Sequence, residues 1–281
     1  MIRCIAMDLD DTLLDDDLTI SLENRTAIQK AGQLGVKIIL ASGRMAQSMR
    51  PYSQELNLDQ PVIAYNGALV YDVITGQALD HHPVPRELAL ELIPIIRGAG
   101  IHLNVYLKDE LYMEELTDWG RKYAANCSVS PRLVRDLRRL VTEGPHKMLA
   151  IGTISEIERL QARLEEHFRG QLDFTRSKPN YLEILGPGVS KGSALQRLVT
   201  RWGIDRSEVI AIGDAPNDLE MITWAGIGVA MGNAVDQVKE RAGFIAPDNN
   251  HHAVAEVIQR FVLSREERGA QENQLRVSSA G

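Results

Sequence analysis

Cysteine is scarce in this chain, and long hydrophobic runs are missing. Of its 281 residues only Cys4 and Cys127 are cysteines, which predicts ordinary reduced thiols rather than a disulfide framework. No apolar stretch approaches the ~18 residues that a membrane-spanning helix needs. The chain reaches Asp8 before any long apolar run, so we expect neither a signal peptide nor a membrane partner, but a cytoplasmic protein.

Positive charge is in short supply as well. The chain carries 31 Lys and Arg against 38 Asp and Glu, a formal net charge of −7. An extended nucleic-acid interface needs a basic surface, so this balance argues against a nucleic-acid partner but leaves room for a local pocket that binds a small anion. No internal repeat is visible, and the length allows one large or two smaller domains.

The most informative stretch lies near the N-terminus, where a short apolar run ends at acidic residues. Residues 2–7 predict a buried strand, and Asp8 and Asp10 follow it directly. Because buried carboxylates are costly without opposite charge, a cation should lie close to them. Mg²⁺ is the simplest candidate, since it prefers oxygen ligands. The alternative is a strand that merely ends in an acidic turn.

Strands and helices alternate at the start of the chain as in a doubly wound parallel sheet. Parallel strands bring their C-terminal ends to one edge, where open α/β sheets bind ligands, so Asp8, Asp10, Ser42 and Asn66 should meet there. The elements expected after the first strand are a helix at 22–34 capped by Ser21, a strand at 36–41, a helix ending near residue 56 and a strand at 61–65.

The middle of the chain shows a mixed α+β pattern that follows a hairpin over residues 69–79. We assign residues 83–187 to an inserted α+β cap domain, and residues 1–82 and 188–281 to a Rossmann-like core. The cap elements expected are helices at 86–99, 116–125 and 155–168 and strands at 101–107, 111–115, 146–151, 172–176 and 181–185.

The parallel-sheet pattern then resumes. Lys191 begins a helix capped by Ser190, and Asp214 and Asp218 follow a buried strand. Carboxylates from distant segments suit an Mg²⁺ site, and a hydroxyl, an ammonium and helix N-termini suit a phosphoryl group. The elements expected are a helix at 191–203, a strand at 209–212, a strand at 226–230, a helix at 235–241, an edge strand at 244–245, a helix at 252–263 and a frayed tail at 264–281.

These segments resemble, in order, the four motifs of the haloacid dehalogenase (HAD) superfamily of phosphatases. The insertion between the second and third motifs resembles the C2 cap of the Cof-type subfamily. The resemblance spans nearly the whole chain. The motif segments are Asp8-Leu9-Asp10-Asp11-Thr12, then Ser42, then Lys191, then Gly213-Asp214-Ala215-Pro216-Asn217-Asp218, with further similarity at Ala41–Arg44, Asn66–Ala68 and Gly188–Gly192.

The resemblance implies a role for each motif residue. It implies that Asp8 is the nucleophile and forms an aspartyl-phosphate, and that Asp10 is the general acid and then the general base. It also implies that Mg²⁺ binds the side chains of Asp8 and Asp214 and the backbone carbonyl of Asp10, with Asp218 holding its water shell. The phosphate-binding groups that it implies are Ser42, the backbone amides of Leu9 and Gly43, Lys191 and Asn217.

The expected function is Mg²⁺-dependent hydrolysis of small phosphomonoesters, sugar phosphates or related metabolites. A phosphotransferase or phosphomutase would use the same intermediate, and an anion-binding regulator is a third class that the intact motif set argues against. The cap should set substrate choice, with the segments at 108–109 and 178–180 as candidates. For Arg44 we expect a substrate contact, with a surface position as the alternative.

Several of these residues also have structural alternatives. A buried polar residue can cap a helix or order a turn without taking part in chemistry. The alternatives are a helix cap for Ser42 and Asp214, a solvated position for Lys191, a turn-ordering role for Thr12, exposed polar pairs for His81-His82 and His251-His252, and a place in the cap core for Trp119–Tyr123.

Overall fold

A parallel sheet of five strands forms the centre of the protein. The structure is a computed structural model that describes residues 1–127 and 129–264, so the tail expected at 264–281 lies, apart from its first residue, outside the described residues. The strand order is β14-β13-β12-β1-β2, and every neighbouring pair is parallel. The strands are β1 (Cys4–Met7), β2 (Lys37–Leu40), β12 (Val209–Gly213), β13 (Ile227–Ala230) and β14 (Phe244–Ile245).

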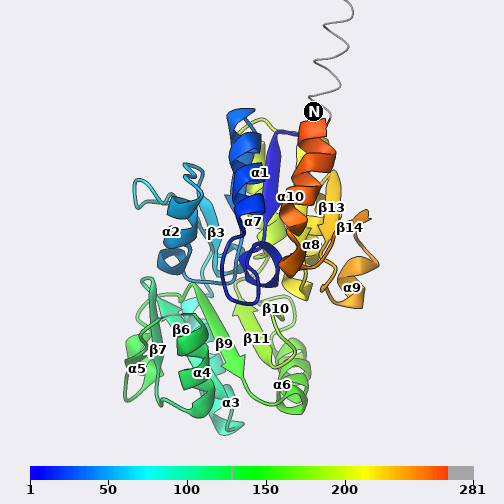
Figure 1. Cartoon of the computed structure of the whole chain (residues 1–281). Helices are drawn as coiled ribbons and strands as arrows, with labels where there is room; N and C mark the ends of the chain where they lie inside the picture. Colours follow the sequence, from blue (N-terminus) through cyan, green and yellow to red (C-terminus); the bar gives the residue numbers. More distant parts are fainter. Residues whose placement is uncertain (128, 265–281) are drawn as a thin grey trace, which may run out of the picture.

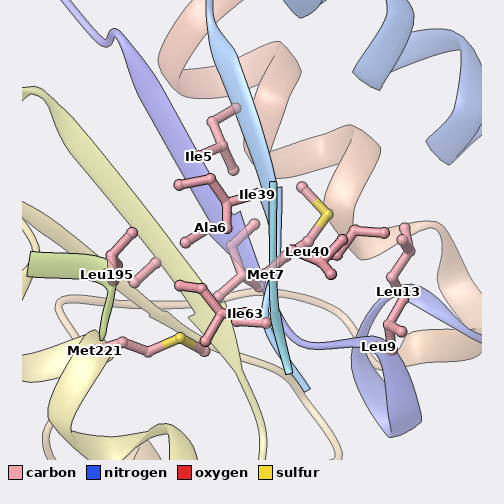
Figure 2. Packing of buried hydrophobic residues seen from close by; sticks show 14 of the residues in the cluster. Ile5, Ala6, Met7, Leu9, Leu13, Ile39, Leu40, Ile63, Leu195 and Met221 are labelled. Atoms are coloured by element: carbon pink, nitrogen blue, oxygen red, sulfur yellow. The ribbon is translucent and has the colours of Figure 1, made fainter. Parts of the chain in front are cut away.

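The apolar run at the N-terminus becomes the central strand of this sheet. β1 pairs with β2 on one side and β12 on the other, and all four of its residues are fully buried. Figure 2 shows Ile5 and Met7 of β1 among apolar side chains from neighbouring elements, such as Leu195 and Met221. Burial raises the pKa of the Cys4 thiol to about 12, as suits an unreactive core cysteine.

Helices accompany the strands in the order that the sequence predicts. Ser21 caps the first helix by accepting a hydrogen bond from the backbone N–H of Asn24, and Gly35 follows the helix with φ of +82°. α1 packs against α10, and α7 packs against α8 (Figure 1). The helices of this part are α1 (Leu22–Gln33), α2 (Ala46–Glu55), α7 (Lys191–Arg201), α8 (Leu219–Trp224), α9 (Asp236–Lys239) and α10 (Ala253–Ile258).

The strand expected at 61–65 does not extend the parallel sheet. β3 (Val62–Ala64) pairs antiparallel with β4 (Leu69–Tyr71), which pairs with β5 (Ala78–His81). Only an isolated parallel bridge between Ala41 and Ile63 joins it to the end of β2. The reason is that β4, the first strand of the predicted hairpin, follows β3 closely in the chain and forms hydrogen bonds with its backbone groups.

A second sheet of six strands lies below the first in Figure 1. Its order is β10-β11-β9-β6-β7-β8, and only the pair β7–β8 is parallel. The strands are β6 (His102–Leu107), β7 (Glu110–Met113), β8 (Arg132–Leu133), β9 (Lys147–Ile151), β10 (Asp173–Thr175) and β11 (Tyr181–Leu185). The helices are α3 (Arg86–Gly98), α4 (Asp118–Asn126), α5 (Leu137–Leu140) and α6 (Ile154–His167).

The second sheet has a hydrophobic cluster of its own. Leu92 and Ile96 of α3, Met148 of β9 and Leu160 and Leu164 of α6 belong to it. β8 and α5 were not predicted, because two and four residues are too few for a periodic pattern. An α/β core sheet with a separate, mostly antiparallel sheet agrees with the predicted fold class, whereas the domain boundaries at residues 82, 83, 187 and 188 stay a prediction.

None of the helices in residues 1–127 and 129–264 combines the length and the apolar character that a membrane span requires.

Candidate active site

Carboxylates and a lysine meet at the C-terminal edge of the parallel sheet. Asp8 follows β1, and Asp214 follows the neighbouring strand β12. The Nζ atom of Lys191 lies 2.8 Å from Asp8 Oδ1 and 2.7 Å from Asp218 Oδ1. Carboxylate oxygens of Asp8, Asp214 and Asp218 lie within 4.8 Å of one another. Segments some two hundred residues apart therefore converge closely enough to share one cation.

A helical turn directly after β1 holds the first of these carboxylates. Within residues 9–13 the backbone leaves helical geometry at Asp10, whose ψ is 133°, and at Asp11, whose φ is +57°. The buried side chains of Leu9 and Leu13 anchor the turn, and Figure 2 shows both near the end of β1. The backbone N–H of Leu9 donates to Asp8 Oδ1 at 2.7 Å. The turn itself therefore fixes one oxygen of Asp8.

Lys191 is buried rather than solvated. Its side chain has no exposed surface, so the alternative of a solvated first-turn residue is wrong. Ser190 caps α7 as predicted, accepting a hydrogen bond from the backbone N–H of Ser193 at 2.9 Å. Burial alone would lower the pKa of Lys191, but the charges of Asp218 and Asp8 outweigh burial and hold that pKa above its ordinary value.

Asp218 has both carboxylate oxygens occupied by protein groups. Oδ1 accepts from Lys191, and Oδ2 accepts from the backbone N–H groups of Asp214 and Ala215 at 3.1 Å each. Gly213 is required before this loop, because a Cβ there would lie 2.4 Å from Asp218 Cγ. These contacts position the lysine and the loop. The expected role of Asp218 in holding a metal's water shell stays a prediction.

One lysine does not balance the negative charge of this cluster. Burial, followed by repulsion from Asp218, raises the pKa of Asp214 to about 8. Burial also raises the pKa of Asp8 well above its usual range; the charge of Lys191 opposes this shift, and Asp218 and Asp214 add to it. A divalent cation would remove the excess negative charge, so these oxygen donors fit Mg²⁺.

We therefore expect the stabilisation of the protein by Mg²⁺ to grow with pH. In the metal-free protein the pKa values of Asp8 and Asp214 lie above their ordinary value of 3.8, so the folded chain keeps protons that the unfolded chain has released. Its stability falls as pH rises from about 4 towards 8, by at most about 1.4 kcal/mol per pH unit for each group. Melting temperatures with and without Mg²⁺ across this window measure the effect. A difference that is the same at every pH would contradict the assignment.

The loop after β2 packs tightly against the residues that follow β3. The Oγ atom of Ser42 accepts from the backbone N–H of Arg44 at 3.1 Å, and the backbone N–H of Asn66 donates to Ser42 O. A Cβ on Gly43 would lie 3.0 Å from Asn66 Oδ1. Asn217 reaches the same amide, donating from Nδ2 to Asn66 Oδ1 at 3.0 Å. These contacts join the loop after β2, the turn after β3 and the loop after β12, which together form the predicted phosphate site.

Two buried amide atoms in this cluster have no hydrogen-bond partner among the described residues. They are Asn66 Nδ2 and Asn217 Oδ1. A buried donor without a partner is costly, so Asn66 Nδ2 is available for an anion oxygen. Asn217 is one of the predicted phosphate-binding groups. Its Nδ2 donates to Asn66 Oδ1, and the phosphate contact stays a prediction.

Arg44 is buried and paired with Asp10, so the surface alternative is wrong. Its side chain is 8% exposed, and its Nε and Nη2 atoms donate to the two carboxylate oxygens of Asp10 at 2.9 and 2.6 Å. Burial would raise the pKa of Asp10, but the hydrogen bond and charge of Arg44 outweigh it and hold that pKa below its usual value. Arg44 also lies over the ring of Tyr52, 5.4 Å from its centroid.

A cavity of about 350 Å³ lies over these groups. Both sheets line it. From the first part come Asp8, Asp10, Ser42, Arg44, Asp214 and Asn217, and from the second Tyr123, Asn126, Cys127, Lys147, Ser177, Lys178, Tyr181 and Glu183. The second part of the chain therefore forms the far wall of the site.

Of the two segments expected to contact substrate, one lies in the cavity wall. Lys178 lines the cavity. Asp109 instead accepts hydrogen bonds from the backbone N–H groups of Ala46 and Gln47, at 3.1 and 3.2 Å, and from the hydroxyl of Tyr65. It therefore holds the second sheet against the N-terminus of α2.

Sequence reasoning missed three groups at the site. The hydroxyl of Thr12 donates to Asp214 Oδ1 at 2.8 Å, so it does more than order a turn. Lys147 and Glu183 form a buried ion pair in the cavity wall at 2.8 Å. The available signal was a single charge inside each of two otherwise apolar strands, because such a charge is seldom buried without a reason.

Two further structural alternatives, for the histidine pairs and for Trp119–Tyr123, have different outcomes. The histidine pairs are exposed, as predicted, and their members have separate partners: His82 pairs with Asp80, and His251 with Asp248. The expectation of cap core for Trp119–Tyr123 is wrong for Trp119, which is 36% exposed. Tyr123 is buried, but it belongs to the hydrophobic cluster that includes the first sheet, and it lines the cavity.

Comparison with known proteins shows similarity to hydrolases and phosphatases in sequence and in structure. The family model described as haloacid dehalogenase-like hydrolase matches residues 5–258. A putative phosphatase of Bacillus subtilis (strain 168), YxeH, is 33% identical over 94% of this chain and 100% of its own length. The phosphatase YitU of the same organism, named for 5-amino-6-(5-phospho-D-ribitylamino)uracil, is 32% identical over 92% of this chain and 96% of its own length. A haloacid dehalogenase-like hydrolase structure from Bacteroides thetaiotaomicron superposes with a TM-score of 0.84 at 31% identity, over 92% of this chain and 99% of that one.

Proposed function

The chain belongs to the haloacid dehalogenase-like hydrolase family and is a phosphoric monoester hydrolase, and from this premise we propose that it is an Mg²⁺-dependent phosphatase of small phosphorylated metabolites, such as sugar phosphates. Membership confirms the family that the sequence motifs resemble. The observation that carries the proposal is the cluster of Asp8, Asp214, Asp218 and Lys191, of which Asp8 and Asp214 line the cavity. The relative named for a phosphoribityl compound supports a small phosphorylated metabolite as substrate.

Asp8 is the proposed nucleophile. Its Oδ1 is held by the amide of Leu9 and by Lys191, while no hydrogen bond among the described residues reaches its Oδ2. We assign to Oδ2 the attack on phosphorus, which forms an aspartyl-phosphate as the ester P–O bond breaks. Lys191 lowers the pKa of Asp8, so that together with a bound divalent cation it would favour the ionised form that attacks, and it offsets charge on the phosphoryl oxygens.

Asp10 is the proposed proton carrier, and Arg44 sets its state. In the free protein Arg44 holds the pKa of Asp10 low, so the carboxyl is ionised. A phosphoryl dianion beside this pair competes for the guanidinium and raises the pKa of Asp10. Asp10 then takes up a proton from solvent and gives it to the departing alkoxide. In the second step it takes a proton from the water that attacks phosphorus, and the bond between phosphorus and Asp8 Oδ2 breaks, which releases phosphate and regenerates Asp8.

The oxygen donors proposed for Mg²⁺ are Asp8, Asp214 and the backbone carbonyl of Asp10. Thr12 orients Asp214 through its hydroxyl, and Asp218 orients the loop. Mg²⁺ bound there would neutralise charge on the phosphoryl group. We assign Ser42 and Asn66, which are joined by a hydrogen bond from the backbone N–H of Asn66 to Ser42 O, as neutral hydrogen-bonding groups for the phosphoryl oxygens.

Phosphate release tests this function directly. Purified protein with Mg²⁺ should release phosphate from p-nitrophenyl phosphate and from sugar phosphates, and excess EDTA should abolish the release until Mg²⁺ is restored. Addition of alcohols separates hydrolysis from phosphotransfer, because a phosphotransferase would give phosphorylated alcohol in place of phosphate. Full activity in EDTA, or transfer without hydrolysis, would overturn the proposal.

A further inference from the structure

The helix that follows the loop after β2 begins without a capping side chain of its own. α2 starts at Ala46, soon after Ser42 and Arg44, and the residue at its N-cap position is Met45. Met45 has the extended backbone of an N-cap, with φ of −65° and ψ of 148°, but its side chain makes no capping hydrogen bond. The first N–H groups of a helix have no partner within the helix, so those of α2 need an acceptor from elsewhere.

Asp109 of the second sheet supplies this acceptor. Its Oδ1 accepts from the backbone N–H of Ala46 at 3.1 Å, and its Oδ2 accepts from that of Gln47 at 3.2 Å. The side chain of Gln47 donates in turn to the backbone carbonyl of Asp109 at 2.6 Å. A carboxylate at the N-terminus of a helix is also favoured by the helix dipole. A residue 63 positions beyond Ala46 therefore acts as the cap of α2.

The same carboxylate reaches the turn after β3. Asp109 Oδ1 also accepts from the hydroxyl of Tyr65, whose side chain is fully buried. The backbone N–H of Tyr65 donates to Arg44 O at 3.0 Å. The next residue, Asn66, donates from its own backbone N–H to Ser42 O. Asp109 therefore bridges the two segments that carry Ser42 and Asn66, the neutral groups assigned to the phosphoryl oxygens.

The turn that contains Asp109 does not itself call for a carboxylate. Lys108 and Asp109 form a two-residue turn between β6 and β7, with φ of +53° and +56°. Glycine adopts such left-handed backbone without strain and is favoured at the second position of this kind of turn. The hairpin therefore does not explain an aspartate at position 109, whereas the contacts with α2 and Tyr65 do.

A second contact from the same sheet holds the other end of the loop after β2. The Nζ atom of Lys147 donates to the backbone carbonyl of Gly43 at 2.6 Å. Gly43 and Ser42 are predicted to bind the phosphoryl group, so the positions of both depend on how the second sheet is docked. Asp109 itself does not line the cavity, so any effect that it has on phosphate must act through the loop.

We propose that Asp109 is a positioning residue: by capping α2 from the second sheet, it holds the loop after β2 in the shape that binds the phosphoryl group. Docking of the second sheet and binding of phosphate then support each other, because both depend on one arrangement of this loop. This inference rests on the proposed phosphatase function and adds the residue that shapes its phosphate site.

Two substitutions at position 109 test it on the full chain with Mg²⁺. Asp109→Gly removes both acceptor oxygens but suits the left-handed backbone, so it should not weaken the hairpin. Asp109→Asn keeps one acceptor oxygen for Ala46 and Tyr65. We expect Asp109→Gly to raise the inhibition constant of inorganic phosphate and to lower kcat for p-nitrophenyl phosphate, by about tenfold each, and Asp109→Asn to change either by less than about threefold.

Inorganic phosphate is the informative probe. It has no alcohol portion, and the groups predicted to hold it come from the first part of the chain, so a residue that only docks the second sheet would leave its inhibition constant unchanged. Hydrogen exchange at the amides of Ala46 and Gln47 reports the cap without any assay of activity, and it should be faster in Asp109→Gly. The matched control is Lys108→Gly, which changes the same turn at a side chain that is 70% exposed and should match the wild type in each measurement.

The outcomes separate the two proposals. If Asp109→Gly keeps the wild-type inhibition constant for phosphate while p-nitrophenyl phosphate is still cleaved, the positioning role is wrong and the phosphatase function stands. An Asp109→Asn variant as impaired as Asp109→Gly would also overturn the positioning role, because the acceptor would then not be the cause. A wild-type protein inactive towards every ester removes the phosphatase function, and this inference with it. Thermal melting confirms that each variant is folded.

Discussion

Replacing Asp8 with Asn will abolish phosphate release while the protein stays folded. An amide oxygen is a poor nucleophile, so kcat for p-nitrophenyl phosphate should fall by at least about 1000-fold. The metal-free variant should melt no lower than the wild type, because the substitution relieves the burial and repulsion that raise the pKa of Asp8. Steady-state assays and thermal melts measure the two effects.

The matched control for this variant is Asp17→Asn. Asp17 lies in the exposed loop after the same motif and does not line the cavity, so its loss of charge should leave kcat unchanged. If Asp8→Asn retains wild-type activity, the nucleophile is another group and the proposed mechanism is wrong. If it loses activity only because it unfolds, the melting curve will show this directly.

Replacing Lys191 with Met should cost both stability and activity. The substitution leaves the buried carboxylates of Asp8 and Asp218 without their cation, and removing one partner of a buried pair typically costs about 3–5 kcal/mol. Activity should fall at least about 100-fold, because Lys191 offsets charge on the phosphoryl group and lowers the pKa of the Asp8 nucleophile. Urea unfolding and p-nitrophenyl phosphate hydrolysis measure these losses.

A double variant separates the two losses. Lys191→Met/Asp218→Asn removes the uncompensated charge of Asp218, so it should recover part of the stability while activity stays low. Lys30→Met, on the exposed face of α1, supplies the control for the loss of one lysine. Wild-type stability in Lys191→Met would show that the buried contacts with Asp8 and Asp218 do not contribute as argued.

Local patterns predicted most of the elements, because each depends on residues close in sequence. The run before Asp8 became the central strand, and Ser21 and Ser190 cap helices as expected. The prediction failed at β3, where an apolar run alone does not say which neighbour a strand pairs with. It also failed at the short elements β8 and α5.

By itself, the sequence determined the fold class, the family and the acidic residues that follow β1 and β12, since apolar periodicity and motif order are properties of the chain. Only the tertiary structure decided that Arg44 pairs with Asp10, that Thr12 holds Asp214, and that the second sheet places Glu183 in the cavity wall. The physical reason is that these contacts join residues from 34 to 202 positions apart, so they depend on how the sheets and helices pack and not on any local preference.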